Sequence, residues 1–250
     1  MNSLFDYEFN KARLISYSKM YKEENEENED NNNNEYKEYK EDKTSGSLLE
    51  QVAYCARVSN PTNQNNSLTS EKLCDYLLKN HHFSPFEMVN VCVEIETTRD
   101  ISRQILRHRS FSFQEFSQRY ADPKKHLGFV LREGRLQHPK NRQMSVEMKT
   151  EEEKQINEKF LKLQQELIDK QSELYDFCND NGIAKEQSRV VLSEGLTKTR
   201  MYMNGTLRSW IHYIQIRTDK DTTQKEHCDI AIKIAHEIKK VFPMIIKFIK

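Results

Sequence analysis

Apolar positions in the first half of the chain predict two short helices and one strand. Residues 48–58 and 70–80 repeat their apolar side chains at helical spacing, and Thr69 offers a helix start signal before the second segment. Between Val89 and Thr97 the period changes to two, so that valines and an isoleucine share one face and polar residues share the other. This segment is the clearest strand in the sequence.

A helix is predicted directly after this strand. Thr97 precedes Asp100 by three residues, which is the spacing of a capping box, so we expect the helix to begin near Thr98. Arginines at every fourth position then form one basic stripe on it, made of Arg99, Arg103 and Arg107.

The second half of the chain predicts mostly helix. Thr150 and Glu153 form a capping box that opens a long helix ending near Gly182. The apolar side of this helix consists of Ile156, Phe160, Leu163, Leu167 and Leu174. Further helices are predicted for residues 185–196, 207–217 and 223–242, and a strand within 128–137. The pattern indicates an α+β fold that is richer in helix toward its C-terminus.

Composition favours one domain, residues 1–250, with an insertion that does not fold. Residues 23–43 are rich in Glu, Asn and Lys and hold too little apolar surface to offset the entropy of ordering, so we expect a disordered acidic insertion. Between Glu23 and Asp42 ten acidic residues face two lysines, a balance of −8, so the rest of this neutral chain carries +8. That excess suits anionic ligands, although a solvated mixed surface explains it equally well.

Cysteine usage and hydropathy predict a soluble protein of a reduced intracellular compartment, the cytoplasm. The five cysteines are odd in number, widely spaced and without a Cys-x-x-Cys pair. No secretory leader opens the chain and no apolar run approaches the length of a membrane span. The eight histidines show no metal-binding spacing, and neither a Rossmann nor a Walker glycine pattern occurs.

The densest chemistry lies between residues 107 and 119, which begin with Arg107-His108-Arg109 and end with Ser117-Gln118-Arg119. Phenylalanines and Glu115 lie between them. The planar guanidinium of arginine pairs with phosphate oxygens two at a time, so this cluster favours a phosphorylated, ring-bearing ligand such as a nucleotide. Ser117 lacks the Gly-x-Ser-x-Gly context of a nucleophile.

Arg107-His108-Arg109-x7-Ser117-x-Arg119 resembles the motif of the flavin-dependent (alternative) thymidylate synthase family. Further blocks occur in the family's order: Ser59, the segment 82–87, Gln104, Arg189 and the segment 208–217, so that the resemblance covers about residues 48–242. It implies a central, mainly antiparallel or mixed sheet packed with helices, in a homotetramer whose subunits share active sites. It also implies methylation of dUMP to dTMP with methylenetetrahydrofolate as carbon donor and with FAD, which NADPH reduces, as hydride source.

The resemblance also assigns residues. It places Gln104, Arg107, Glu115, Ser117, Gln118, Arg119, Arg189 and Arg217 at dUMP, and Ser59, Ser84, Glu87, Arg107, His108, Arg109, Glu115, Arg208 and His212 at FAD. Among these, Arg217 is the candidate for stabilising the anionic uracil ring, with Ser117 positioning the ligand rather than attacking it. His82 matches a histidine near flavin and folate, and no metal is implied.

Other interpretations remain open at this point. Arg208 and His212 share a helix face and taken alone could cap, pair or pack as ordinary structural residues. The arginine stripe could track phosphates in a single-stranded nucleic-acid-binding module, although short clusters containing Ser and Glu argue against a continuous basic groove. A catalytically silent relative or scaffold is the third reading. Thr206 and Met88 depart from residues found in some family members.

Overall fold

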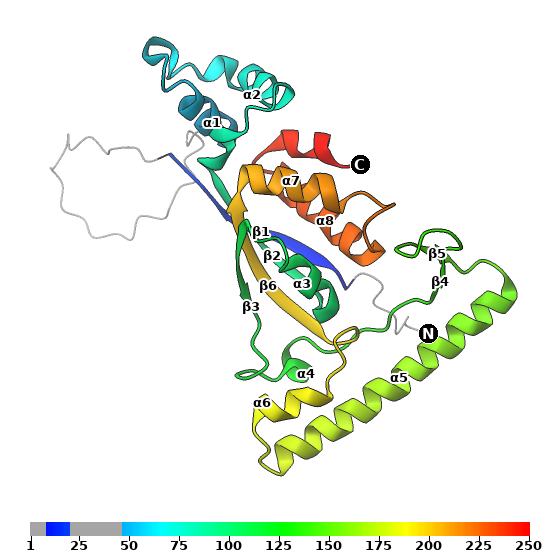
Figure 1. Cartoon of the computed structure of the whole chain (residues 1–250). Coiled ribbons are helices and arrows are strands. Elements are labelled where there is room, and N and C mark those ends of the chain that lie inside the picture. The colour runs from blue at the N-terminus through cyan, green and yellow to red at the C-terminus, as the bar shows by residue number, and fades with distance from the viewer. Residues whose placement is uncertain (1–8, 21–46) are drawn as a thin grey trace, which may run out of the picture.

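The computed structural model describes residues 9–20 and 47–250, and the predicted acidic insertion lies outside these ranges. Its centre is an antiparallel sheet of four strands in the order β1-β2-β6-β3 (Figure 1). The strands are β1 (Lys11–Tyr17), β2 (Asn90–Thr98), β6 (Lys198–Thr206) and β3 (Phe111–Glu115). The α+β class and the antiparallel sheet expected from the sequence are thereby confirmed.

One face of this sheet forms the core and the other is polar. In β2 the side chains of Val91, Val93 and Ile95 are fully buried. They pack in one cluster with residues of α7 (Leu207–Arg217) and α8 (Lys225–Lys239). On the opposite face the cross-strand neighbours Glu96 and Arg200 form an ion pair. Alternating side chains along β2 therefore place apolar residues on the core face and polar residues on the other face, as the period of two predicts.

The remaining elements surround this sheet. They are α1 (Leu48–Ala56), α2 (Ser70–Lys79), α3 (Arg99–Ile105), α4 (Pro123–His126), α5 (Glu151–Asp180), α6 (Lys185–Ser188), the hairpin β4 (Arg135–Gln137) with β5 (Ser145–Glu147), and the 3-10 turns η1 (Pro61–Asn63), η2 (Ser67–Thr69), η3 (Ser84–Glu87), η4 (Arg189–Val191) and η5 (Pro243–Phe248). Figure 1 shows α1 and α2 at one end of the sheet, and α4 and α6 at the other.

The long helix α5 stands away from the sheet as an arm (Figure 1). Its capping box between Thr150 and Glu153 is present as predicted. The predicted apolar side does not face the body of the subunit: Ile156, Phe160, Leu163, Leu167 and Leu174 are 43% to 54% exposed. Phe177, which was not predicted and extends this row to six residues, is 55% exposed. Leu161 and Tyr175, on another side, are the large apolar groups that α5 buries.

Several local predictions were wrong. The hydroxyl of Thr97 donates to Asn10 instead of capping α3, and Thr98 is the N-cap without a side-chain cap bond. The helix predicted for 185–196 ends in a 3-10 turn at Val191, because Leu192 returns to extended backbone and buries its side chain. The strand predicted within 128–137 consists of an isolated bridge at Phe129 and the short strand β4.

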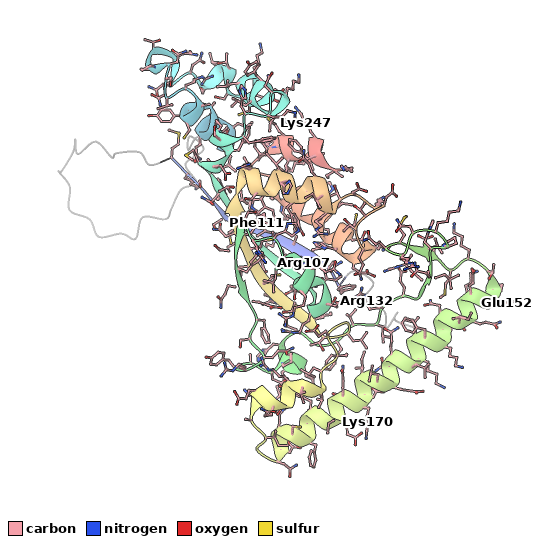
Figure 2. The ribbon with its side chains drawn as sticks, in the orientation of Figure 1. Arg107, Phe111, Arg132, Glu152, Lys170 and Lys247 are labelled. Atoms are coloured by element: carbon pink, nitrogen blue, oxygen red, sulfur yellow. The ribbon has the colours of Figure 1, made fainter. Side chains whose placement is uncertain are left out.

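The motif segment itself contains a strand that periodicity did not reveal. Phe111 begins β3 opposite Gly205 of β6, and its ring lies so close that a Cβ at position 205 would collide with it. The ring also meets the indole of Trp210 edge to face, with 4.7 Å between centroids. Figure 2 labels Arg107 and Phe111 in this region, where the chain passes from α3 to β3. A glycine in β6 therefore lets the motif segment seat against the core.

Candidate active site

A cleft of about 340 Å³ lies beside the start of α7. Phe83, Glu87, Ser110, Arg208, Ser209, Ile211, His212 and Gln215 line it. The carboxylate of Glu87 accepts from the hydroxyl of Thr206 at 2.6 Å and from the guanidinium of Arg208 at 2.5 Å. These two bonds hold the pKa of Glu87 below its ordinary value. The cleft thus combines aromatic and aliphatic walls with fixed polar groups, which suits a planar ring system.

Thr206, which differs from the residue found in some members of the resembling family, has a defined local role. It is the N-cap of α7, and its hydroxyl accepts from the backbone N–H of Ser209 while donating to Glu87. An N-cap hydroxyl satisfies one of the free amides of the first helical turn. Thr206 therefore fixes both the start of α7 and the carboxylate that faces Arg208.

His108 and Arg217 contact each other, and His212, which lines this cleft, is near enough to His108 to lower its pKa. The Nε of Arg217 donates to Nε2 of His108 at 2.9 Å. Burial and then the charge of Arg217 lower the pKa of His108 to about 4, so its imidazole is neutral near pH 7. Burial also lowers the pKa of Arg217, with Arg107 contributing in the same direction. With Nε2 accepting from Arg217, the proton of His108 is assigned to Nδ1, where it faces away from Arg217.

Gln104 adjoins this pair from α3. Its Nε2 donates to Oε1 of Gln224 at 2.7 Å, and its Oε1 lies 3.2 Å from Nδ1 of His227. Neither Gln224 nor His227 was singled out from the sequence, because a Gln and a His at the start of a helix carry no motif. Structure brings them to Gln104 across more than a hundred residues of chain.

A second group of predicted residues gathers at the other end of β3. Glu115 accepts from the hydroxyls of Ser102 and Thr199, both at 2.9 Å, and lies 3.6 Å from the guanidiniums of Arg99 and Arg103. Glu115 therefore pairs with two of the three arginines of the stripe. The sequence had assigned it to ligand contacts and had not paired it with these arginines.

Arg189 and Gln118 lie beside this cluster in a cleft of about 400 Å³ that Arg99 and Arg103 also line. Gln118 is buried, and its side-chain nitrogen has no hydrogen-bond partner within the described residues. A buried N–H without a partner is costly, so this group is suited to bind an acceptor on a ligand.

Several other predicted site residues line neither the cleft beside α7 nor the cleft beside Arg189. Ser59, His82, Ser84 and Arg109 are exposed. The Oγ of Ser117 accepts from the backbone N–H of Arg119, whose guanidinium pairs with Glu186 at 3.4 Å. Within the described residues no side chain is hydrogen-bonded to the Oγ of Ser117, and its predicted positioning role stays a prediction.

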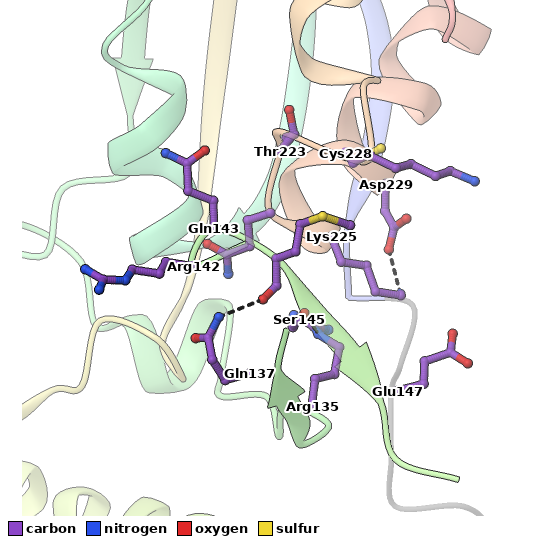
Figure 3. A pocket seen from close by; sticks show the side chains of 13 residues that line it. Arg135, Gln137, Arg142, Gln143, Ser145, Glu147, Thr223, Lys225, Cys228 and Asp229 are labelled. Atoms are coloured by element: carbon purple, nitrogen blue, oxygen red, sulfur yellow. Dashed lines mark hydrogen bonds and ion pairs between the residues drawn. The ribbon is translucent and has the colours of Figure 1, made fainter. Parts of the chain in front are cut away.

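A further cleft, of about 560 Å³, lies between the β4–β5 hairpin and the start of α8 (Figure 3). The side chains of Arg135, Gln137, Lys225 and Asp229 project into it or along its wall, and Lys225 pairs with Asp229 at 2.9 Å. The sequence did not predict this cleft, because it depends on how the hairpin packs against α8.

Within residues 9–20 and 47–250 no group of His, Cys, Asp and Glu could hold a metal ion. Nor is any helix in those ranges long and apolar enough to cross a membrane.

Residues 42–244 match the sequence model of the protein family described as thymidylate synthase complementing protein. The chain is 43% identical over 202 residues to a probable flavin-dependent thymidylate synthase of Paramecium bursaria Chlorella virus 1, covering 79% of this chain and 88% of the relative. It is 44% identical over 194 residues to the flavin-dependent thymidylate synthase of Synechocystis, covering 78% and 86%.

Among solved structures, the fold is similar to that of a UMP/dUMP methylase from Streptomyces cacaoi bound with 5-Br dUMP. The TM-score is 0.71 at 22% identity, over 96% of this chain and 93% of the other. The antiparallel sheet with α7 and α8 on one face is thus shared with a protein of low sequence identity. By sequence and over most of its length, the chain belongs to the family of flavin-dependent thymidylate synthases.

Proposed function

We propose that this protein converts dUMP to dTMP with a flavin cofactor. The observation that carries the proposal is a pair of guanidiniums held on α7: Arg208 is bonded to Glu87 at a cleft with aromatic side chains, and Arg217, at the other end of this helix, is bonded to the neutral His108. Methylenetetrahydrofolate as carbon donor and NADPH as reductant complete the proposed reaction in the cytoplasm. All of these are small molecules, and no nucleic acid or membrane is involved.

The residues that line the cleft beside the start of α7 fit part of FAD. Phe83 and Ile211 offer apolar contact, whereas Arg208, His212 and Ser209 offer hydrogen-bonding groups for a polar ring edge or phosphates. Flavin supplies hydride chemistry when bound. The protein's part is to bind and orient it, and to keep His108 neutral so that Nε2 can accept from Arg217 while Nδ1 carries the proton.

Arg217 is the residue to which we assign stabilisation of uracil. Adding carbon at C5 requires electron density on the ring, and a guanidinium near a ring carbonyl stabilises the anionic form. Its bond to His108 uses only Nε, which leaves the terminal nitrogens of Arg217 for substrate. Gln104, whose amide keeps one N–H and one lone pair, completes the ring-binding edge.

The two groups of predicted dUMP residues lie at opposite ends of β3. Five residues of strand separate them by about 17 Å at roughly 3.4 Å a residue, which favours phosphate and ring contacts from different subunits. In one subunit Gln104, Arg107 and Arg217 hold the ring end, and in another Gln118 and Arg189 hold the phosphate.

The exposed stripe of α5 supports such an assembly. Its six apolar residues recur at intervals of four and three, apart from Lys170, as in a coiled-coil seam. An apolar row of this length on an arm is suited to pack on another copy. We infer a homotetramer with active sites between subunits.

The experiment is dTMP detection by chromatography, with dUMP, methylenetetrahydrofolate and NADPH under low oxygen, with and without added FAD. Wild type is expected to form dTMP only with FAD. Arg217→Ala is expected to lose dTMP formation by at least about a hundredfold while it keeps flavin, read from visible absorbance. Arg13→Ala, on the polar face and paired with Glu94, is the matched control and should retain activity.

Near-normal turnover of Arg217→Ala would remove Arg217 from the chemistry. Absence of dTMP from wild type that binds both FAD and dUMP would indicate a silent relative. Salt-sensitive binding of long single-stranded nucleic acid would support the rival binding module, which the pairing of Arg99 and Arg103 with Glu115 disfavours.

A further inference from the structure

A chain of four buried or half-buried hydrogen bonds runs behind Gln104. It joins Tyr213 of α7 to His227 of α8 at 3.1 Å, His227 to Gln104 at 3.2 Å, Gln104 to Gln224 at 2.7 Å, and Gln224 to Glu226 at 2.9 Å. Tyr213 and His227 have no exposed surface, and Glu226 is buried. None of these groups other than Gln104 belongs to the residues assigned to substrate or cofactor.

The direction of every bond in this chain follows from its charged end. A carboxylate only accepts, so the amide nitrogen of Gln224 faces Glu226 and its oxygen faces Gln104. Gln104 must then present its nitrogen to Gln224 and its oxygen to His227, which requires a proton on Nδ1 of that imidazole. With Nδ1 donating, Nε2 accepts from the hydroxyl of Tyr213. All four bonds therefore donate toward Glu226.

Two arginines hold the carboxylate end in place. Arg132 lies 3.0 Å and Arg135 2.7 Å from the oxygens of Glu226. Burial alone raises the pKa of Glu226, but these guanidiniums outweigh burial and lower the pKa to about 2, so the group is ionised. Figure 2 labels Arg132 in the segment that leads toward the β4–β5 hairpin. The two arginines that fix Glu226 thus lie outside α3, α7 and α8, the helices at which the hydrogen-bonded residues lie.

The tyrosine end is held neutral. Burial lowers the pKa of His227 to about 3, and burial raises the pKa of the Tyr213 hydroxyl above its ordinary value. Neither group changes charge near pH 7, so the donor and acceptor pattern persists there. Aligned bonds of this kind polarise one another, and a reversed amide would leave buried groups unpaired.

We propose that Glu226, Gln224, His227 and Tyr213 are positioning residues that fix the orientation of the Gln104 amide and thereby make the site prefer uracil to cytosine. The inference rests on the proposed function, in which Gln104 lies at the ring of dUMP. After its two internal bonds, Gln104 retains one N–H and one carbonyl lone pair. Uracil offers a carbonyl oxygen and an N–H on one edge, whereas cytosine offers an amino group and an unprotonated nitrogen there. Reversing the amide exchanges which base it suits.

The test uses His227→Leu, which removes both bonds of the imidazole, and His227→Gln, whose amide can donate to Gln104 and accept from Tyr213. The dissociation constants of dUMP and dCMP are measured by calorimetry on the FAD-loaded protein. His227→Leu is expected to weaken dUMP about tenfold and to reduce the preference for dUMP over dCMP by at least that factor. His227→Gln is expected to stay within about threefold of wild type in both values.

The kinetic arm separates positioning from general damage. In His227→Leu the KM for dUMP should rise about tenfold while kcat and flavin content change less than about threefold. Loss of kcat and of flavin together, with the dUMP to dCMP preference unchanged, would overturn the proposal in favour of a structural role. A matched pair, Tyr213→Phe and Tyr175→Phe, compares two fully buried tyrosines, of which only Tyr213 is in the chain. Only Tyr213→Phe should reduce the preference, and by less than His227→Leu, because it leaves the bond from His227 to Gln104 in place.

A direct measurement does not depend on activity. In protein labelled with ¹⁵N-histidine, long-range ¹H–¹⁵N spectra assign the proton of His227 to Nδ1 or Nε2. Nδ1–H is expected, and Nε2–H would overturn the direction of the chain. If wild type binds dUMP but forms no dTMP, the proposed reaction is wrong. The dissociation constants of dUMP and dCMP and the tautomer of His227 still test the role of the hydrogen-bond chain in that case.

Discussion

The buried imidazole of His227 makes the protein lose stability in mild acid. Its pKa falls from 6.5 to about 3 on folding, chiefly through burial. A group whose protonated form is disfavoured by folding destabilises the folded state once the pH drops below the unfolded pKa. The loss begins near the unfolded value of 6.5 and continues until the folded value of about 3. The unfolded chain binds the extra proton throughout that interval.

The magnitude follows from proton linkage. Between about pH 7 and about pH 5 the unfolded imidazole becomes protonated while the folded one does not, which costs about 2 kcal/mol at roughly 1.4 kcal/mol per pH unit. His108, with a pKa of about 4, contributes in the same direction. A single unfolding curve therefore cannot isolate His227, and a comparison with a non-titrating side chain is required.

The assay is urea unfolding of wild type and His227→Gln at both pH values, at one protein concentration so that the proposed subunit association affects both proteins equally. The wild-type loss of unfolding free energy between about pH 7 and about pH 5 should exceed the variant's loss by about 2 kcal/mol. Titrating groups that do not interact with His227 cancel in this difference of differences, and His108, with its folded pKa of about 4, stays mostly neutral when folded over this interval. Equal losses in the two proteins would refute the assignment of His227 as a buried neutral group.

Three further outcomes follow from packing and charge. Gly205→Ala should lower the free energy of unfolding by about 1–3 kcal/mol in chemical denaturation, because the added Cβ meets the Phe111 ring; unchanged stability would contradict that contact. Leu163→Glu should shift sedimentation toward smaller species with helical circular dichroism retained, whereas an unchanged assembly would exclude this side of α5 from the interface. Glu226→Gln should cost about 3–5 kcal/mol near pH 7. The wild-type advantage should shrink as pH falls from 4.5 to about 2, so a pH-independent difference would contradict an ionised Glu226.

The sequence predicted elements wherever one period persisted over enough residues. The apolar alternation of β2 and the helical spacing of α7 and α8 were recovered to within a few residues. Strand β6 escaped prediction although Met201 and Met203 alternate with polar residues, because methionine and the glycine at 205 are weak strand signals. The apolar row of α5 was recovered, but periodicity cannot tell whether such a row faces the same subunit or another copy.

Local residue patterns predicted the site only where its residues are close in sequence, and the more distant residues, such as Arg217, were named by the family resemblance. Arg107 and His108 stand together in a motif, so they could be named from the sequence alone. The partner of His108 is Arg217, which lies 109 positions away, and no local pattern joins the two. Gln224 and His227 were missed for the same reason: their importance comes from the packing of α8 against α3 and α7, which places them on Gln104.

The polar interior behind Gln104 lowers the stability of the fold but fixes the orientation of the Gln104 amide. Removing a carboxylate and two guanidiniums from water costs several kcal/mol per ion, and apolar residues of similar volume commonly give a more stable core. An apolar core could not choose between the two orientations of an amide, since it has neither donors nor acceptors. Glu226 makes that choice because it can only accept, and Arg132 and Arg135 keep it ionised. Under the proposed function, the segment that carries these arginines therefore influences the contact between Gln104 and dUMP without touching the substrate, through bonds whose direction is fixed at one charged end.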